Sequence, residues 1–255
     1  MRIKALGVSG SGGSRNNSSA FLVDGVLLLD AGTVVGELSA KEENRIRYIL
    51  LSHAHLDHIK GIPFLLSSRA GSGTGTPITI MGGKEVLGDI RKHIFNSRIW
   101  PDFTKIPSRE SPLLCYKTLT QARLCLLDGY TIAMERVSHT VPANGFIVAN
   151  HTKKAVAYTG DTGPTELFWK RMEKFDVKAL ITEISFPNRL ERFARMSGHF
   201  TPALLEEEIR KMSRLPDTIF VMHMKSQFER EIRAEVRKLR RKNLGLLEDG
   251  DEIVF

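Results

Sequence analysis

The chain has 255 residues, of which 42% are hydrophobic, and its formal net charge is +8. This length suits one large domain over residues 1–255, which can bury enough apolar surface to fold without disulfide bonds. The positive charge favours an anionic partner, such as a nucleotide or a nucleic acid.

The cysteines and the apolar segments predict the cellular compartment of the protein. Cys115 and Cys125 lie in apolar runs without the spacing of metal ligands, so we expect buried free thiols. Reduced thiols and the lack of a secretory leader predict a cytoplasmic protein. The apolar stretch of residues 21–29 is interrupted by Asp24 and Gly25, so we expect no membrane span.

Short apolar runs predict strands along the whole chain. The pairs Asp24-Gly25 and Asp128-Gly129 each separate two such runs, which favours tight β-hairpins. Strands are expected at residues 3–8, 21–23, 26–29, 48–51, 124–127, 130–134, 146–148, 155–158, 177–181 and 218–222.

Helical signals alternate with these strands. Thr201 followed by Pro202 is typical of a helix start, with a capping hydroxyl before a proline in the first turn. Helices are expected at residues 58–66, 84–93, 164–173, 202–212 and 226–241. The alternation predicts an α/β fold with two sheets packed between helices.

Two segments suggest phosphate or RNA binding but have simpler interpretations. Residues 7–14 are rich in Gly and Ser but lack the Gly-Lys-Ser/Thr ending of a phosphate-binding loop, so we expect a flexible loop near a site mouth. Basic residues crowd positions 230–242 around an apolar stripe at helical spacing. We interpret them as the solvated face of a helix, with RNA binding as the alternative.

The segment of residues 52–58 reads Ser-His-Ala-His-Leu-Asp-His and follows the apolar strand of residues 48–51. A polar cluster at a strand end lies where ligand sites form in α/β sheets. Imidazole and carboxylate groups bind zinc and similar ions. One tetrahedral ion cannot easily use four ligands from so short a loop. We therefore expect two neighbouring ions, one on His53 and His55 and one on Asp57 and His58.

Further polar residues follow other predicted strands. His139 and His223 each come at a strand end, and Asp161 lies between Gly160 and Gly163, where it can approach two ions closely. Asp30 follows an apolar run and could fix the tautomer of a ligand imidazole.

The order His-x-His-x-Asp-His, lone His, Gly-Asp-Thr-Gly and strand-end His resembles the metallo-β-lactamase superfamily. The resemblance covers most of the chain and implies an αββα sandwich. It also implies a set of ligands for two divalent ions: His53, His55 and His139 for the first, Asp57, His58 and His223 for the second, and Asp161 as the bridge.

Two later motifs resemble the phosphodiesterase branch of that superfamily, which includes the tRNA 3′-processing endonucleases. Glu183 ends a strand, and His199 lies in Gly-His-Phe-Thr-Pro. The resemblance implies that His199 faces the scissile phosphate and that Glu183 orients it. A charged imidazole can stabilise the transition state or protonate the leaving oxygen. With Asp57, these residues form the expected catalytic group.

Residues 92–103 resemble a segment of the class II 3′,5′-cyclic-nucleotide phosphodiesterases. Aromatic side chains here could form a wall on which a purine stacks. The expected substrate-binding residues are His93, Phe95, Asn96, Trp100 and Phe103. The alternative for the aromatic residues is ordinary core or a dimer contact.

We therefore predict a dinuclear-metal phosphodiesterase acting on 3′,5′-cyclic nucleotides such as cAMP and cGMP. Zinc is the expected ion, with manganese or iron as alternatives. The expected partners are a small anionic nucleotide and a second copy in a homodimer. The alternative substrate is tRNA or another RNA, which the basic C-terminal helix favours weakly. Only 21 residues separate His139 from Asp161, where long-form tRNA-processing relatives carry an extra arm. That interval has room for little beyond two strands, which counts against tRNA.

Overall fold

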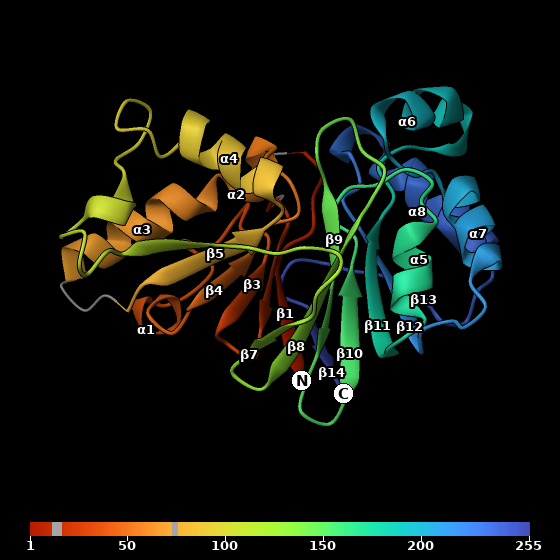
Figure 1. Cartoon of the computed structure of the whole chain (residues 1–255). Coiled ribbons are helices and arrows are strands. Elements are labelled where there is room, and N and C mark those ends of the chain that lie inside the picture. The colour runs from red at the N-terminus through yellow and green to blue at the C-terminus, as the bar shows by residue number, and fades with distance from the viewer. Residues whose placement is uncertain (12–16, 73–75) are drawn as a thin grey trace.

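Two seven-stranded sheets lie face to face, with helices on the outer side of each (Figure 1). The computed structural model describes residues 1–11, 17–72 and 76–255. The layers run helix, sheet, sheet, helix, so the expected αββα sandwich is confirmed. Part of the expected loop over residues 7–14 falls on residues 12–16, outside the described residues.

The first sheet is antiparallel on one side and parallel on the other. Its strands, in spatial order, are β14 (Glu252–Val254), β1 (Arg2–Gly7), β2 (Ala20–Val23), β3 (Leu27–Leu29), β4 (Tyr48–Leu50), β5 (Ile78–Gly82) and β6 (Leu114–Thr118). The pairings from β3 to β6 are parallel. The helices joined to this sheet are α1 (Ala40–Glu43), α2 (Leu56–Ile59), α3 (Gly61–Ser72), α4 (Lys84–His93) and the 3₁₀ turn η1 (Phe103–Lys105).

The second sheet repeats this mixture. Its order is β13 (Leu244–Leu246), β12 (Thr218–Met222), β11 (Asp176–Glu183), β10 (Lys154–Tyr158), β9 (Asn144–Ala149), β8 (Tyr130–Arg136) and β7 (Cys125–Leu127). The pairings from β10 to β13 are parallel. The accompanying helices are α5 (Leu167–Met172), η2 (Asn188–Leu190), α6 (Glu191–Ser197), α7 (Pro202–Lys211), η3 (Ser226–Phe228) and α8 (Glu229–Lys238).

Among the described residues, three apolar clusters hold the layers together. One lies between the sheets and includes Phe21, Phe146 and Tyr158, all fully buried. The other two lie between each sheet and its helices. Strand β9 is buried along its whole length because both of its faces are covered.

Some expected elements differ from those observed. The helix expected at residues 58–66 is two helices, α2 and α3, and that expected at 226–241 begins as a 3₁₀ turn and ends at Lys238. Strands β5 and β6 and helix α6 were not expected. Cys115 and Cys125 are free, as expected, but only half-buried, because β6 and β7 are the outermost strands of their sheets.

The fold brings five strand ends to one edge. Strands β4, β8, β10 and β12 end just before the segments that carry the expected ligands, and β11 ends at Glu183 itself. These loops meet at the upper edge of the molecule in Figure 1, between α2 and α6. In the described part of the chain, no helix has both the length and the apolar character needed to cross a membrane.

Candidate metal centre

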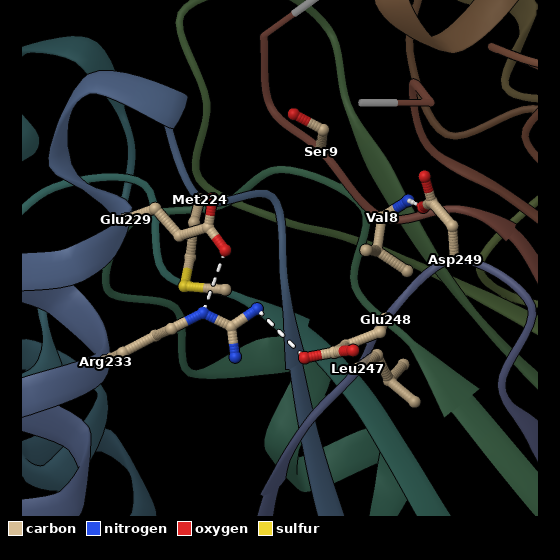
Figure 2. A pocket seen from close by; sticks show the side chains of 8 residues that line it. All are labelled: Val8, Ser9, Met224, Glu229, Arg233, Leu247, Glu248 and Asp249. Carbon is tan, nitrogen blue, oxygen red and sulfur yellow. Dashed lines mark hydrogen bonds and ion pairs between the residues drawn. The ribbon is translucent and has the colours of Figure 1, made fainter. Parts of the chain in front are cut away.

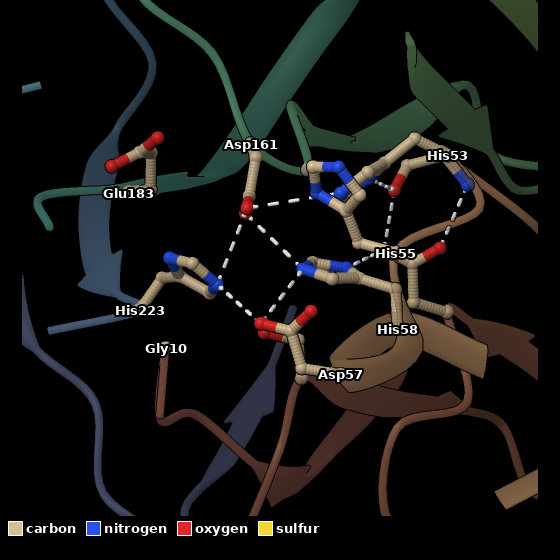
Figure 3. A network of polar contacts seen from close by, with 12 residues as sticks. Gly10, His53, His55, Asp57, His58, Asp161, Glu183 and His223 are labelled. Atoms are coloured by element: carbon tan, nitrogen blue, oxygen red, sulfur yellow. Dashed lines mark hydrogen bonds and ion pairs between the residues drawn. The ribbon is translucent and has the colours of Figure 1, made fainter. Parts of the chain in front are cut away.

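The seven expected ligands converge at this edge. All of them except His139 are labelled in Figure 3. His53, His55, His139 and Asp161 offer one group of ligand atoms, and Asp57, His58 and His223 offer another. Within each group all ligand atoms lie within 4.8 Å of one another. The two groups adjoin at Asp161, which lies between His58 and His223.

The spacing of the ligand atoms matches that of atoms sharing an ion. The Nε2 atom of His223 lies 3.3 Å from both Asp57 Oδ2 and Asp161 Oδ2. Asp161 Oδ1 lies 3.3 Å from His58 Nε2, and His55 Nδ1 lies 3.3 Å from His139 Nε2. Two ligands on a tetrahedral zinc, with bonds of about 2.0–2.1 Å, lie about 3.3 Å apart.

Buried polar atoms without partners mark the same place. His53 Nε2, His58 Nε2 and Asp161 Oδ1 are buried and make no hydrogen bond within the described residues. Such atoms are rare in folded proteins unless a water or an ion satisfies them. The residues present therefore fit a pair of divalent ions.

Charge in the cluster points the same way. Burial lowers the pKa of His53, His55 and His139, so these imidazoles are neutral and keep a lone pair for an ion. Burial opposes charge on Asp161 too, but His223 and His58 outweigh it and hold the pKa well below its usual value. Asp161 is thus ionised and can bind a cation. Burial opposes charge on His58 as well, but Asp161 and Asp30 outweigh it and raise its pKa well above the usual value, so a bound ion would have to displace that proton.

Asp30 organises the imidazoles from behind. It is fully buried, and its carboxylate accepts hydrogen bonds from Ser52 N (2.7 Å), Ser52 Oγ (2.6 Å) and Tyr158 OH (2.6 Å). His58 Nδ1 lies 2.6 Å from the same carboxylate, so the contact expected between Asp30 and a site imidazole is confirmed. Ser52 Oγ also lies 3.0 Å from His53 Nδ1. These contacts leave the Nε2 atoms of both histidines directed at the cluster.

His223 is held in a strained backbone conformation, with φ of +65°. Its N–H donates to Val8 O (2.6 Å), and its Nδ1 lies 2.9 Å from Ser185 Oγ. Gly10 packs against it so closely that a Cβ would lie 2.3 Å from His223 O and 2.6 Å from Nδ1. Only glycine fits this approach.

Glu183 and His199 form a buried pair beside the ligands. His199 Nδ1 lies 2.6 Å from Glu183 Oε1, and the His199 ring lies 5.0 Å from that of His139 and 5.7 Å from that of His223. Burial disfavours charge on His199, but Glu183 outweighs it and raises the pKa above its ordinary value. Ser185 Oγ donates to Glu183 Oε2 (2.7 Å), which links the pair to His223. His199 can therefore act as a proton donor.

The five expected substrate-binding residues are outside the two groups of ligand atoms, and two of them are buried. Phe95 and Phe103 are only 4% and 3% exposed in the core of the first sheet, so the expected stacking wall is wrong for both: neither ring has a free face. Trp100 packs edge-on against Phe64 (5.4 Å). Asn96 closes a turn by accepting from the N–H groups of residues 98 and 99. His93 is exposed at the end of α4.

A cavity of about 340 Å³ is lined in part by Met224, the residue that follows His223 in the sequence (Figure 2). Its charged groups are already paired: Arg233 with Glu229 (2.8 Å) and with Glu248 (3.3 Å), while Asp249 accepts from Val8 N (3.0 Å). Because these charges are matched within the protein, we place the chemistry at the ligand cluster instead.

Several supporting residues were not found from the sequence. Ser52 directly precedes His53, and Tyr158 precedes the Gly-Asp motif, so their positions could have drawn attention. Gly10 and Ser185 gave no such signal, because their importance depends on contacts with His223, more than 35 positions away.

A comparison with known protein families identifies the family of the chain. The family described as "Beta-lactamase superfamily domain" matches residues 26–224. The chain belongs to the beta-lactamase superfamily. The resemblance that the motifs predicted is thus confirmed, and the protein is a member of a hydrolase family.

Individual relatives point to phosphodiesterases. A "Probable 3′,5′-cyclic-nucleotide phosphodiesterase" of Yersinia pestis is 28% identical over 291 residues, covering 93% of this chain and 81% of that protein. A Ribonuclease Z of Lactobacillus helveticus is 27% identical, covering 64% of this chain and 49% of that protein. Unliganded yeast PDE1 superposes with a TM-score of 0.83 at 18% identity, over 100% of this chain and 99% of that one. At that identity, the superposition shows the shared fold alone.

Proposed function

We propose that this protein is a dinuclear-metal phosphodiesterase that hydrolyses 3′,5′-cyclic nucleotides to 5′-monophosphates. The observation that carries the proposal is the Glu183–His199 pair, buried against the rings of His139 and His223. The 3′ oxygen of a cyclic nucleotide needs a proton as it leaves phosphorus, and a charged histidine beside the expected metal ligands can supply it. The names of the relatives in Yersinia pestis and Aliivibrio fischeri support the same substrate.

The proposed ion sites follow the two groups of ligand atoms. His53, His55 and His139 would hold one ion, Asp57, His58 and His223 the other, and Asp161 would contact both. Two divalent ions bound there would polarise the phosphoryl oxygens and activate a water molecule. Zinc suits the histidine-rich set best, while the mixed nitrogen and oxygen ligands also accept manganese or iron.

The protein's own residues handle the leaving group. Glu183 accepts a hydrogen bond from His199 Nδ1 and stabilises the charged imidazole. Its other oxygen accepts from Ser185 Oγ, which keeps the carboxylate from rotating away. His199 Nε2 then donates a proton to the 3′ oxygen as the bond to phosphorus breaks.

Two further parts of the proposal concern the charge of the substrate and the assembly of the protein. A small anionic nucleotide suits a chain with a net charge of +8. We also keep the homodimer as a prediction, which a sedimentation mass of one chain would contradict.

A second candidate function is the processing of tRNA 3′ ends. It is favoured by the similarity to Ribonuclease Z of Lactobacillus helveticus, although that match covers 64% of this chain. Against it, the interval between His139 and Asp161 is taken up by the paired strands β9 and β10.

A panel of substrates separates the two candidates. Zinc- or manganese-loaded protein would be incubated with cyclic AMP, cyclic GMP and a precursor tRNA, beside an Asp161→Ala control. We expect 5′-monophosphate from the cyclic nucleotides, intact tRNA and no product from the control. Cleavage of the tRNA alone, with affinity that falls steeply with salt, would replace the proposal with the second candidate.

A further inference from the structure

Helix α6 is fixed directly against the metal centre. Gly198, which follows it, accepts a hydrogen bond from His139 Nδ1 at 2.9 Å and has φ of +67°. A Cβ on Gly198 would lie 2.8 Å from His139 Cα, so the backbone at the end of the helix touches an expected ligand. The C-terminal end of α6 therefore lies at the rim of the site.

A row of aromatic rings leads from His199 to the surface of α6. The ring of Phe186 lies 5.6 Å from that of His199 and 5.1 Å from that of Phe193, edge to face in both cases. Phe186 is only 6% exposed, whereas Phe193 is 53% exposed. Only the ring of Phe186 thus separates Phe193 from His199, and the side chain of Phe193 is exposed to solvent.

Met196 extends this apolar surface. It follows Phe193 by three positions, which places both side chains on one side of α6, and it is 71% exposed. Exposed apolar residues are common on folded proteins, but these two lie on the helix whose end contacts His139, and Phe193 also ends the row of rings from His199. A flexible thioether next to an aromatic ring adapts well to a flat ligand.

We propose that Phe193 and Met196 bind the base of the nucleotide. This inference rests on the proposed function, which supplies a substrate with a phosphate at the ligand cluster and a base attached through ribose. With the leaving oxygen at His199, the base extends toward α6 and stacks on Phe193. Because every base has a flat face, stacking of this kind accepts adenine and guanine alike.

Direct binding tests this inference without requiring turnover. The dissociation constants of AMP and of inorganic phosphate would be measured by calorimetry on the full-length, metal-loaded protein. We expect Phe193→Ala to weaken AMP about tenfold and to leave phosphate unchanged, because only AMP carries a base. Phe193→Trp should restore AMP binding. The matched control is Leu126→Ala, which removes a side chain 76% exposed on β7 and should change neither constant.

Three results would overturn the inference: AMP affinity unaffected by Phe193→Ala, equal weakening of AMP and phosphate, or wild-type protein that binds AMP no more tightly than phosphate. A variant whose sedimentation mass changes while AMP affinity does not would assign α6 to a contact between copies instead. The proposed function is tested separately, by cyclic AMP hydrolysis. Wild-type protein that does not hydrolyse cyclic AMP would contradict the proposed substrate. If its affinity for AMP still depended on Phe193, the base-binding site would stand.

Discussion

At the scale of single residues, Glu183 is the neighbour that favours the charged form of His199. Glu183 raises the pKa of His199 against the opposing effect of burial, so the imidazole stays charged to a higher pH than usual. If His199 donates a proton, activity is retained below this raised pKa and lost as pH rises through it. Glu183→Gln removes the carboxylate and lowers the pKa, so the alkaline limb of the pH–rate profile should move to lower pH.

The control for this prediction is Glu166→Gln. Glu166 is an exposed acid that pairs with Lys170, away from the site. Its profile should match that of the wild type, and both variants should keep their bound metal. An alkaline limb that stays in place in Glu183→Gln would show that His199 is not the proton donor.

Asp30 acts on the ions through the imidazoles that it orients. Asp30→Asn places an N–H₂ group among neighbours that already donate to it, and so frees the His58 ring to rotate. We expect metal affinity to fall about 10- to 100-fold, measured by competition with a chelating dye. Tyr158→Phe removes only one of these donors and should cost less. Equal affinity in Asp30→Asn and the wild type would contradict the role given to Asp30.

At the scale of elements, the segment after β1 supports the end of β12. Gly10→Ala would push a methyl group into His223, because the gap admits no Cβ. We expect loss of one ion per chain and at least tenfold lower activity, with the ion content measured by atomic emission. Gly88→Ala in α4 is the control: its Cβ meets nothing within 4 Å, and alanine should stabilise the helix by up to about 1 kcal/mol. Full metal content in Gly10→Ala would contradict the prediction.

The elements also explain which parts of the structure could be predicted. His53, Asp161 and His223 follow apolar strands, and that local pattern was enough to place them. Strand β5 is a short apolar run, for which periodicity cannot separate strand from helix. Helix α6 has seven residues, too few to be stable alone, so packing of its buried Ala194 decides its form.

Contacts between distant segments were beyond prediction. Tyr158 donates a hydrogen bond to Asp30, which is 128 positions away in the sequence. No local sequence pattern predicts such a bond. The aromatic wall expected at residues 95–103 failed for the same reason. The sequence around Phe95 and Phe103 does not show whether their rings face a ligand or the helices of their own layer. Tertiary packing decides this, and in the structure both rings are buried in the core.

At the scale of the whole molecule, the two sheets meet around a set of buried carboxylates. Asp30, Asp161 and Glu183 are all at most 2% exposed where the strand ends converge. Ions bound only by the folded state stabilise it, by about 2.7 kcal/mol for each site at a hundredfold excess over its dissociation constant. We therefore expect a chelator to lower the Tm of the wild type clearly and that of Asp161→Ala little. An unchanged wild-type Tm would contradict metal binding at this place.

The central claim is that two ions held by these seven residues are needed to hydrolyse a cyclic nucleotide. It is tested most directly by adding zinc or manganese stepwise to metal-free protein and measuring cyclic AMP hydrolysis at each ratio. We expect 5′-AMP formation to rise until two ions are bound per chain and then to stay constant. Full activity at one ion per chain, or hydrolysis that does not depend on added metal, would contradict it.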